Sequence, residues 1–298
     1  MRRISRRTAF KTALLGGAAA IGATSARAAT NEPIAAPPDA VGLLYDATLC
    51  IGCKACVVAC KEANDMPAET SGSGGLYDRP DDLSCHTKNI IKLYRSGNET
   101  SFVKRQCMHC LDPACVGACM MSALKKREHG IVSWDGTRCV GCRYCEIACP
   151  YGVPKFEWTT EQAIYNPRIV KCELCRHRLA VRKEPACSEV CPRKAVIYGT
   201  RDDLLKEAKR RIAAHPETYI PKVYGETEGG GTQVLYLSHV DFDKVGLPAL
   251  TDESLPAAVH KVQGTIYKGF IAPIALYGVL AAAITRNKKR DASQEEPS

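Results

Sequence analysis

Residues 139–150 have the sequence CVGCRYCEIACP, in which four cysteines at C-x2-C-x2-C-x3-C spacing are followed by a proline. This is the spacing of a bacterial ferredoxin motif. Its first three cysteines wrap a loop around three irons of one cubane, so that backbone amides can point at the cluster sulfurs. The fourth cysteine, three residues further on, faces away toward a second cluster. Such motifs therefore work in pairs, and each gives its last cysteine to its partner.

Three more cysteine runs with related spacing are present, and the last also ends in proline, Pro192. The four motifs together contain sixteen of the seventeen cysteines, the number that four [4Fe–4S] clusters require. In chain order the motif cysteines are Cys50, Cys53, Cys56 and Cys60; Cys107, Cys110, Cys115 and Cys119; Cys139, Cys142, Cys145 and Cys149; and Cys172, Cys175, Cys187 and Cys191.

Two other interpretations of so many cysteines are a structural zinc protein and a disulfide framework. Zinc sites use paired C-x2-C knuckles or Cys/His sets rather than runs that end in C-x3-C-P. A disulfide framework suits exported proteins, but C-x2-C-x2-C places the thiols too close along the chain to pair productively. Cys85 has no companion at ligand spacing and is predicted to be a structural or free thiol. His109 and His177 are not expected to be ligands, because no motif lacks a cysteine.

The formal net charge of +9 does not indicate a nucleic-acid partner. Six of the basic residues lie within the first 28 residues, where there is no acid, and nine minus six leaves +3 for the remainder. No basic stripe with interleaved aromatics is present, and aromatics make up only 6% of the chain. The sequence therefore predicts a fold organised around inorganic centres rather than around a large apolar core.

The secondary-structure pattern predicts an α+β fold of duplicated bacterial-ferredoxin-like domains with insertions, spanning residues 42–203. The segment Asn64–Gly97 (64–97) is rich in Gly, Ser and Asp and is interpreted as an insertion. A helix should follow Thr200, with Asp203 at the capping-box position. The extension 204–263 contains Gly229-Gly230-Gly231, interpreted as a flexible turn and not a phosphate loop. Predicted strands are 42–46, 101–104, 124–126, 131–135 and 195–199.

The N-terminus has the pattern of an export signal. Arg6 and Arg7 precede a weakly apolar stretch and an A-x-A site that ends at Ala28. A twin-arginine signal peptide over 1–28 is therefore expected, followed by a linker over 29–41. That route carries proteins already folded around cofactors.

The C-terminal region resembles a membrane anchor. Residues 269–284 carry no charge, and counting from Gly264 the stretch approaches the length that spans a bilayer. The basic residues of 286–298 favour a cytoplasmic tail. The expected arrangement is a single transmembrane helix over 264–285 with the cysteine-rich part in the periplasm; a buried helix of a soluble protein is the alternative.

With these motifs the chain resembles the four-cluster ferredoxin subunits of membrane-bound oxidoreductases, the family that includes the electron-transfer subunits of dimethyl sulfoxide reductase and formate dehydrogenase. Finer features, from the signal peptide to the anchor, are similar to the HybA-type iron–sulfur subunits of hydrogenase-2 [NiFe] hydrogenases. These features are Leu44-Tyr45-Asp46, the segments 104–110, 141–145, 149–151, 171–175, 224–226 and 229–234, and Tyr267-Lys268-Gly269. One departure is Met120, at a position where a proline often follows the last cysteine of motif two.

The resemblance implies four ligand sets, because motif one pairs with motif four and motif two with motif three. Each set takes three cysteines from one motif and the last cysteine of its partner. Set 1 is Cys50, Cys53, Cys56 and Cys191; set 2 is Cys107, Cys110, Cys115 and Cys149; set 3 is Cys139, Cys142, Cys145 and Cys119; set 4 is Cys172, Cys175, Cys187 and Cys60.

The resemblance further implies a relay that passes electrons between hydrogenase small and large subunits and a quinone-reactive membrane subunit. No catalytic motif is visible, so the chain is not expected to be an enzyme by itself. Lys54 and Arg143 are candidates for tuning cluster potentials. The same relay role for a molybdenum or tungsten oxidoreductase, acting on formate, a sulfur compound or nitrite, stays open.

Overall fold

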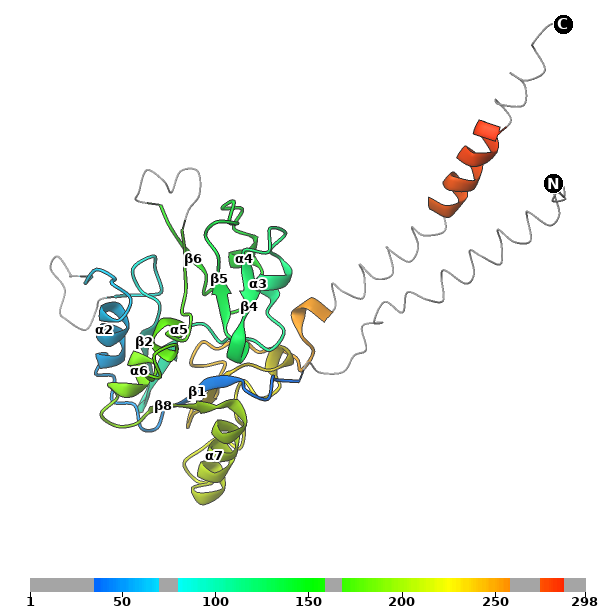
Figure 1. The fold of residues 1–298 in the computed structure, drawn as a ribbon. Helices are drawn as coiled ribbons and strands as arrows, with labels where there is room; N and C mark the ends of the chain where they lie inside the picture. Colours follow the sequence, from blue (N-terminus) through cyan, green and yellow to red (C-terminus); the bar gives the residue numbers. More distant parts are fainter. Residues whose placement is uncertain (1–34, 70–79, 159–167, 258–273, 287–298) are drawn as a thin grey trace, which may run out of the picture. The chain divides into compact units, whose positions relative to one another are not determined.

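The computed structural model describes residues 35–69, 80–158, 168–257 and 274–286 (Figure 1). The chain divides into two units, Pro33–Pro256 and a second one made of Met1–Glu32 with Ala257–Ser298. The described residues exclude the predicted signal peptide 1–28, residues 29–34 of the linker 29–41, and all of the tail 286–298 except Arg286. The larger unit contains all four cysteine motifs.

A three-stranded sheet with strand order β8-β1-β9 lies at the centre of this unit. Strand β1 (Val41–Asp46) pairs antiparallel with β8 (Val196–Thr200) and parallel with β9 (Val234–Leu237). All six residues of β1 are buried, as its position between two strands requires. A Cβ added at Gly42 would lie 1.9 Å from the backbone oxygen of Gln233, so only glycine permits this close approach.

Helix α7 (Arg201–Ala214) covers one face of this sheet (Figure 1). Its cap is as predicted, because Thr200 accepts a hydrogen bond from the Asp203 backbone N–H at 3.3 Å. The apolar stripe of α7 packs against Leu44 of β1 and Leu235 of β9. The stripe consists of Leu204, Leu205, Ala208 and Ile212.

Three hairpins complete the strands, and a strand precedes every cysteine motif. The strands β1, β3, β5 and β7 lead into motifs one to four in turn, which confirms the predicted strands at 42–46, 101–104 and 131–135. The predicted strands at 124–126 and 195–199 are confirmed as well. The hairpins are β2 (Ile90–Ser96) with β3 (Glu99–Arg105), β4 (Leu124–Lys126) with β5 (Val132–Trp134), and β6 (Lys155–Glu157) with β7 (Arg168–Val170).

The sequence pattern missed β2, which lies inside the segment 64–97 interpreted as an insertion. It also missed β6, β7 and β9. These strands are three to seven residues long. In β2 only the first two residues are buried, so buried and exposed positions do not alternate along it. A short strand without a clear alternation of buried and exposed residues carries little signal.

Short helices hold the second half of each motif. The third cysteine of every motif lies in such a helix, and the fourth cysteine follows about one turn later. The helices are α2 (Ala55–Glu62), α3 (Ala114–Gly117), α4 (Tyr144–Ile147) and α6 (Ala186–Glu189), while α5 (Arg176–Leu179) lies within the long spacer of motif four.

The triple glycine forms a fixed turn rather than the flexible one expected. Its first two glycines are part of the single-turn 3-10 helix Glu228–Gly230, and another such turn, Glu128–Gly130, lies in the β4–β5 connection. Gly229 N–H donates to Thr251 O at 2.7 Å, and Gly231 O accepts from Leu111 N–H at 2.9 Å. Hydrogen bonds on both sides therefore hold the turn against motif two.

The C-terminal unit contributes one described helix, over residues 274–286. This helix overlaps the predicted anchor 264–285, whose first ten residues lie outside the described part of the chain. Among the residues that the structure describes, no helix is both long enough and apolar enough to cross a membrane.

Candidate metal centres

All seventeen cysteines have free thiols, so none of the motifs is held by disulfides. Many of these thiols are part of the hydrophobic core rather than of the surface. Cys56, Cys107 and Cys187 are buried in the main core cluster, and Cys145 is buried in a smaller cluster beside β4 and β5. The core of this chain is thus built around the cysteines, as the low aromatic content predicted.

The cysteines of set 1 surround one cavity. Its lining includes Tyr45 from β1 and Ile91 from β2, so strands close it on one side. Burial raises the pKa of the Cys56 thiol to about 12. The four cysteines of the lining are Cys50, Cys53, Cys56 and Cys191.

The cysteines of set 3 surround a second cavity, which Phe156 and Ile169 of the β6–β7 hairpin help to close. Burial, followed by the neighbouring thiols of its set, raises the pKa of Cys145 to about 12. The four cysteines of this lining are Cys119, Cys139, Cys142 and Cys145.

In sets 2 and 4 the nearness of the cysteines is seen in the effect that each thiol has on the pKa of the others. Burial raises the pKa of Cys110 well above its usual value, and Cys107, Cys115 and Cys149 raise it further. Burial likewise raises the pKa of Cys60 to about 12, with added contributions from the set 4 thiols of Cys172, Cys187 and Cys175. In each predicted set, therefore, the last cysteine of one motif lies beside the first three cysteines of its partner motif.

Buried, crowded thiols of this kind suit a bound iron–sulfur cluster. Without a cation, burial and repulsion oppose the thiolate form that a metal needs. Iron supplies the compensating positive charge and displaces the thiol protons. In the described part of the chain, no group of three or more histidine, cysteine or acidic side chains is arranged to hold one metal ion. A cubane differs from zinc in spreading its four thiolates over four irons.

A repeated backbone feature occurs in every cysteine loop. The residue before the second cysteine has a positive φ in each motif: Gly52 at 70°, His109 at 48°, Gly141 at 68° and Leu174 at 51°. Left-handed residues in such turns help to direct successive N–H groups toward one anion. Glycine makes this visible in motifs one and three, whereas nothing in the sequence indicates it at His109 or Leu174.

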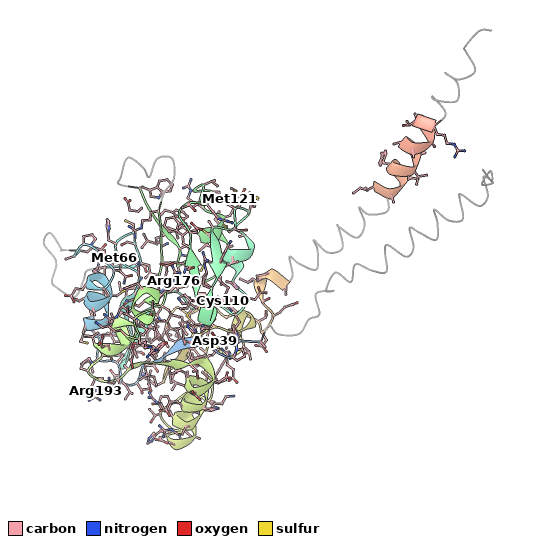
Figure 2. All side chains as sticks on the ribbon, in the orientation of Figure 1. Asp39, Met66, Cys110, Met121, Arg176 and Arg193 are labelled. Carbon is pink, nitrogen blue, oxygen red and sulfur yellow. The ribbon has the colours of Figure 1, made fainter. Side chains whose placement is uncertain are left out.

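The electrostatic effects between cysteines of different sets link the four sets in the order 1–4–2–3. Cys187 of set 4 helps to raise the pKa of the Cys56 thiol of set 1, and Cys172 of set 4 helps to raise that of the Cys107 thiol of set 2. Cys145 of set 3 acts on the Cys115 thiol of set 2. Figure 2 agrees, since Arg193 beside the set 1 cavity and Met121 beside the set 3 cavity are far apart, with Cys110 between them.

The charged residues nearest the sets include two that the sequence pattern did not single out. Lys104 has no exposed surface and Lys171 is 3% exposed. Of the two residues that were singled out, Lys54 lines the set 1 cavity. Arg143 lines the set 3 cavity, and its guanidinium lies 5.2 Å from the ring centre of Trp158. The position of each buried lysine, at or just after the end of a strand that leads into a motif, was the only signal available.

Of the remaining candidates, His109 lies inside the loop of motif two, whereas no motif cysteine is among the main groups that act on Cys85. Cys85 is half-buried, and after burial the carboxylate of Glu157 is the main cause that raises its pKa. His177 is exposed on α5. His109 is fully buried, and its Nδ1 accepts from the Val132 N–H at 3.1 Å, so its neutral ring carries its proton on Nε2.

Together, a strand before each motif, a helix within it and four groups of clustered thiols define a ferredoxin-type iron–sulfur protein. Residues 98–201 match the family model described as a 4Fe-4S dicluster domain. The chain is 40% identical to the hydrogenase-2 operon protein HybA of Escherichia coli O157:H7 over 97% of both chains. It is also 34% identical to the iron–sulfur subunit of the nitrate-inducible formate dehydrogenase of Escherichia coli K12, over 86% of this chain and 89% of that subunit.

The chain therefore belongs to the HybA family of iron–sulfur subunits. It holds [4Fe–4S] clusters and transfers electrons within an oxidoreductase complex. This result removes the alternatives of a structural zinc protein and of a disulfide framework.

Proposed function

We propose that this chain relays electrons through four [4Fe–4S] clusters between a periplasmic [NiFe] hydrogenase and a quinone-reactive membrane subunit. The observation that carries the proposal is the 40% identity to HybA over 97% of both chains. The formate dehydrogenase iron–sulfur subunit matches less well, at 34% identity over 86% of this chain.

In this proposal the sixteen motif cysteines hold one cluster in each of sets 1 to 4. A bound cluster supplies a site that gains and loses one electron at a time. The protein contributes the thiolates, the backbone turns before each second cysteine and a buried setting that limits solvent access. Because the sets lie in series as 1–4–2–3, an electron that enters at set 1 or set 3 can leave at the other end. The chain has no catalytic role of its own in this scheme.

The partners implied are the small and large hydrogenase subunits on one side and an integral membrane subunit on the other. A second candidate is the same relay for a molybdenum or tungsten oxidoreductase. It is supported by the 34% identity to formate dehydrogenase iron–sulfur subunits over 86% of this chain.

Metal analysis of the complex that co-purifies with this chain from detergent-solubilised membranes distinguishes these partners. We expect nickel together with abundant iron, because a [NiFe] hydrogenase would accompany the clusters. Molybdenum or tungsten in place of nickel would keep the relay and assign it to the second candidate. Zinc without iron would contradict the relay itself.

The proposed location is the periplasmic face of the inner membrane, reached by the twin-arginine route and held by a C-terminal anchor over 264–285. Two features support the anchor: residues 269–284 carry no charge, and the described helix 274–286 exposes a series of large apolar side chains. These are Ile274, Leu276, Tyr277, Val279, Leu280 and Ile284.

Export can be tested with the conservative double substitution R6K/R7K. We expect the uncleaved chain to accumulate in the cytoplasm, because the twin-arginine route depends on the paired arginines and not on their charge alone. Cell fractionation and immunoblotting measure the distribution. The substitution R2K/R3K, which changes the neighbouring arginines equally mildly, serves as the control and should be exported normally. Equal export of both variants would argue against this route.

A further inference from the structure

Lys104 is a fully buried lysine that none of the roles above accounts for. It lies near the end of β3, and its side chain has no exposed surface. It pairs directly with Ile91 of β2, and residues paired in this way project from the same face of a hairpin. Since Ile91 lines the cavity of set 1, the Lys104 side chain projects on the face of the hairpin that meets the cysteines.

The Lys104 ammonium has few conventional partners. It donates a hydrogen bond to Gln106 Oε1 at 2.5 Å. In the described part of the chain it takes part in none of the ion pairs with carboxylates. Its backbone oxygen accepts from the Tyr236 hydroxyl at 2.7 Å, which fixes the strand at this point.

The groups that act most strongly on the Lys104 ammonium are cysteine thiols of the motifs, and these are thiolates when they hold a cluster. In order of effect they belong to Cys187, Cys56, Cys172 and Cys60. Three of these four are in set 4 and one, Cys56, is in set 1.

A buried ammonium without an anionic partner is strongly unfavourable. A [4Fe–4S] cluster with four thiolates carries a net negative charge, and reduction adds one more negative charge. A fixed cation beside it therefore stabilises the reduced form more than the oxidised form, which raises the reduction potential.

We propose that Lys104 is the built-in counter-cation of this half of the relay and raises the reduction potential of the set 4 cluster, and to a smaller extent that of the set 1 cluster. The inference rests on the proposed ligand sets. Its consequence is directional: Lys104 shifts the distribution of an electron in this half of the chain from set 1 toward set 4, the set next to set 2.

Lys171 provides a matched internal control. It is 3% exposed, and its Nζ donates to the backbone oxygens of Val132 and, at 3.0 Å, Cys172. Its charge acts on the thiols of Cys107 and Cys115, which belong to set 2. The same substitution at Lys171 should therefore affect a different cluster.

The test is a redox titration, followed by electron paramagnetic resonance, of the purified complex containing K104M, K104R or K171M. For K104M we expect the ratio of reduced to oxidised set 4 cluster at a given potential to fall about tenfold, which corresponds to a shift of about 59 mV to lower potential for one electron. The reduction potential of the set 1 cluster should shift less. In K104R the potentials should stay near those of the unchanged protein, and in K171M the potential of the set 2 cluster should shift instead. A C175S variant identifies the set 4 signal.

The outcomes separate this proposal from the proposed function. Two results would overturn the role of Lys104 and leave the relay intact, provided that the unchanged protein contains four clusters. One is an unchanged reduction potential of the set 4 cluster in K104M, and the other is an equal shift of the potential of one and the same cluster in K104M and K171M. If K104M fails to retain its clusters, the iron content of further variants decides. Iron that is retained in K104R and lost in K104Q supports a required positive charge. Iron that is lost in all three variants shows that the residue only fills space. Absence of clusters from the unchanged protein would instead overturn the proposed function.

Discussion

Replacing Cys191 with serine is expected to remove the cluster at the other end of the cysteine-rich sequence, the one held by motif one. Cys191 is the last cysteine of motif four, yet it lines the same cavity as Cys50, Cys53 and Cys56. Serine oxygen is a poor substitute for a thiolate on iron. Iron content should fall by about a quarter, because one of four cubanes is lost, and the set 1 signal should disappear from electron paramagnetic resonance spectra.

The control for this experiment is Cys85→Ser, which should leave all four clusters intact. Cys85 is the seventeenth cysteine, and no motif cysteine is among the main groups that act on its thiol. If Cys191→Ser removed only the cluster of set 4, motif four would keep its own last cysteine and the proposed pairing would be wrong.

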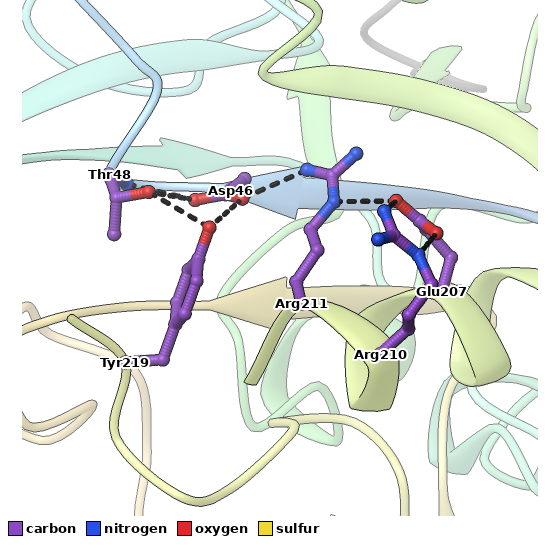
Figure 3. Close-up of polar contacts among 6 residues, drawn as sticks. All are labelled: Asp46, Thr48, Glu207, Arg210, Arg211 and Tyr219. Carbon is purple, nitrogen blue, oxygen red and sulfur yellow. Dashed lines mark hydrogen bonds and ion pairs between the residues drawn. The ribbon is translucent and has the colours of Figure 1, made fainter. Parts of the chain in front are cut away.

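Asp46 is expected to be the residue outside the cysteine motifs whose loss destabilises the central sheet most. Its carboxylate, at the end of β1, has no exposed surface and is fully hydrogen-bonded (Figure 3). One oxygen accepts from Thr48 N–H at 3.0 Å and Thr48 Oγ1 at 2.6 Å. The other accepts from Arg211 Nη1 and from the Tyr219 hydroxyl, both at 2.9 Å. Glu207 in turn holds Arg211 from one turn earlier on α7.

The substitution Asp46→Ala leaves the guanidinium of Arg211 and the hydroxyl of Tyr219 without their buried acceptor. Breaking one side of a buried ion pair costs about 3–5 kcal/mol in the free energy of unfolding. For a domain of this size we expect the temperature at which the visible cluster absorbance is lost to fall by about 10 °C.

The matched control is Lys206→Ala, which removes an ion pair with Asp203 on the same helix. Both side chains of that pair are mostly exposed, so its removal should change stability very little. Similar losses for the two variants would show that the burial of the Asp46 network is not the source of its effect.

The cysteine spacing was enough to predict what this chain binds and much of its local structure. A C-x2-C-x2-C-x3-C run imposes a loop followed by a helical turn whatever surrounds it, which accounts for the helices α2 and α4. The strands before motifs one to three were predicted from short local runs of strand-forming residues. The Thr200 cap of α7 was equally local. Such features depend on residues within a few positions of one another.

The burial of Lys104 and of Asp46 could not be predicted in this way. Lysine and aspartate are ordinarily surface residues, and each is buried here because of groups distant in the sequence. Lys104 is surrounded by thiolates from motifs one and four, and Asp46 is bonded by Arg211 and Tyr219. The same holds for the positive φ of His109, which no local residue preference requires.

The amino-acid sequence alone thus establishes an α+β iron–sulfur protein with sixteen candidate ligands, since ligand type and spacing are local properties of the chain. The series order 1–4–2–3 and the place of a buried cation beside set 4 come only from the folded chain. The physical reason is that electrostatic energies depend on distances through space and on burial, and both are set by which distant segments pack together.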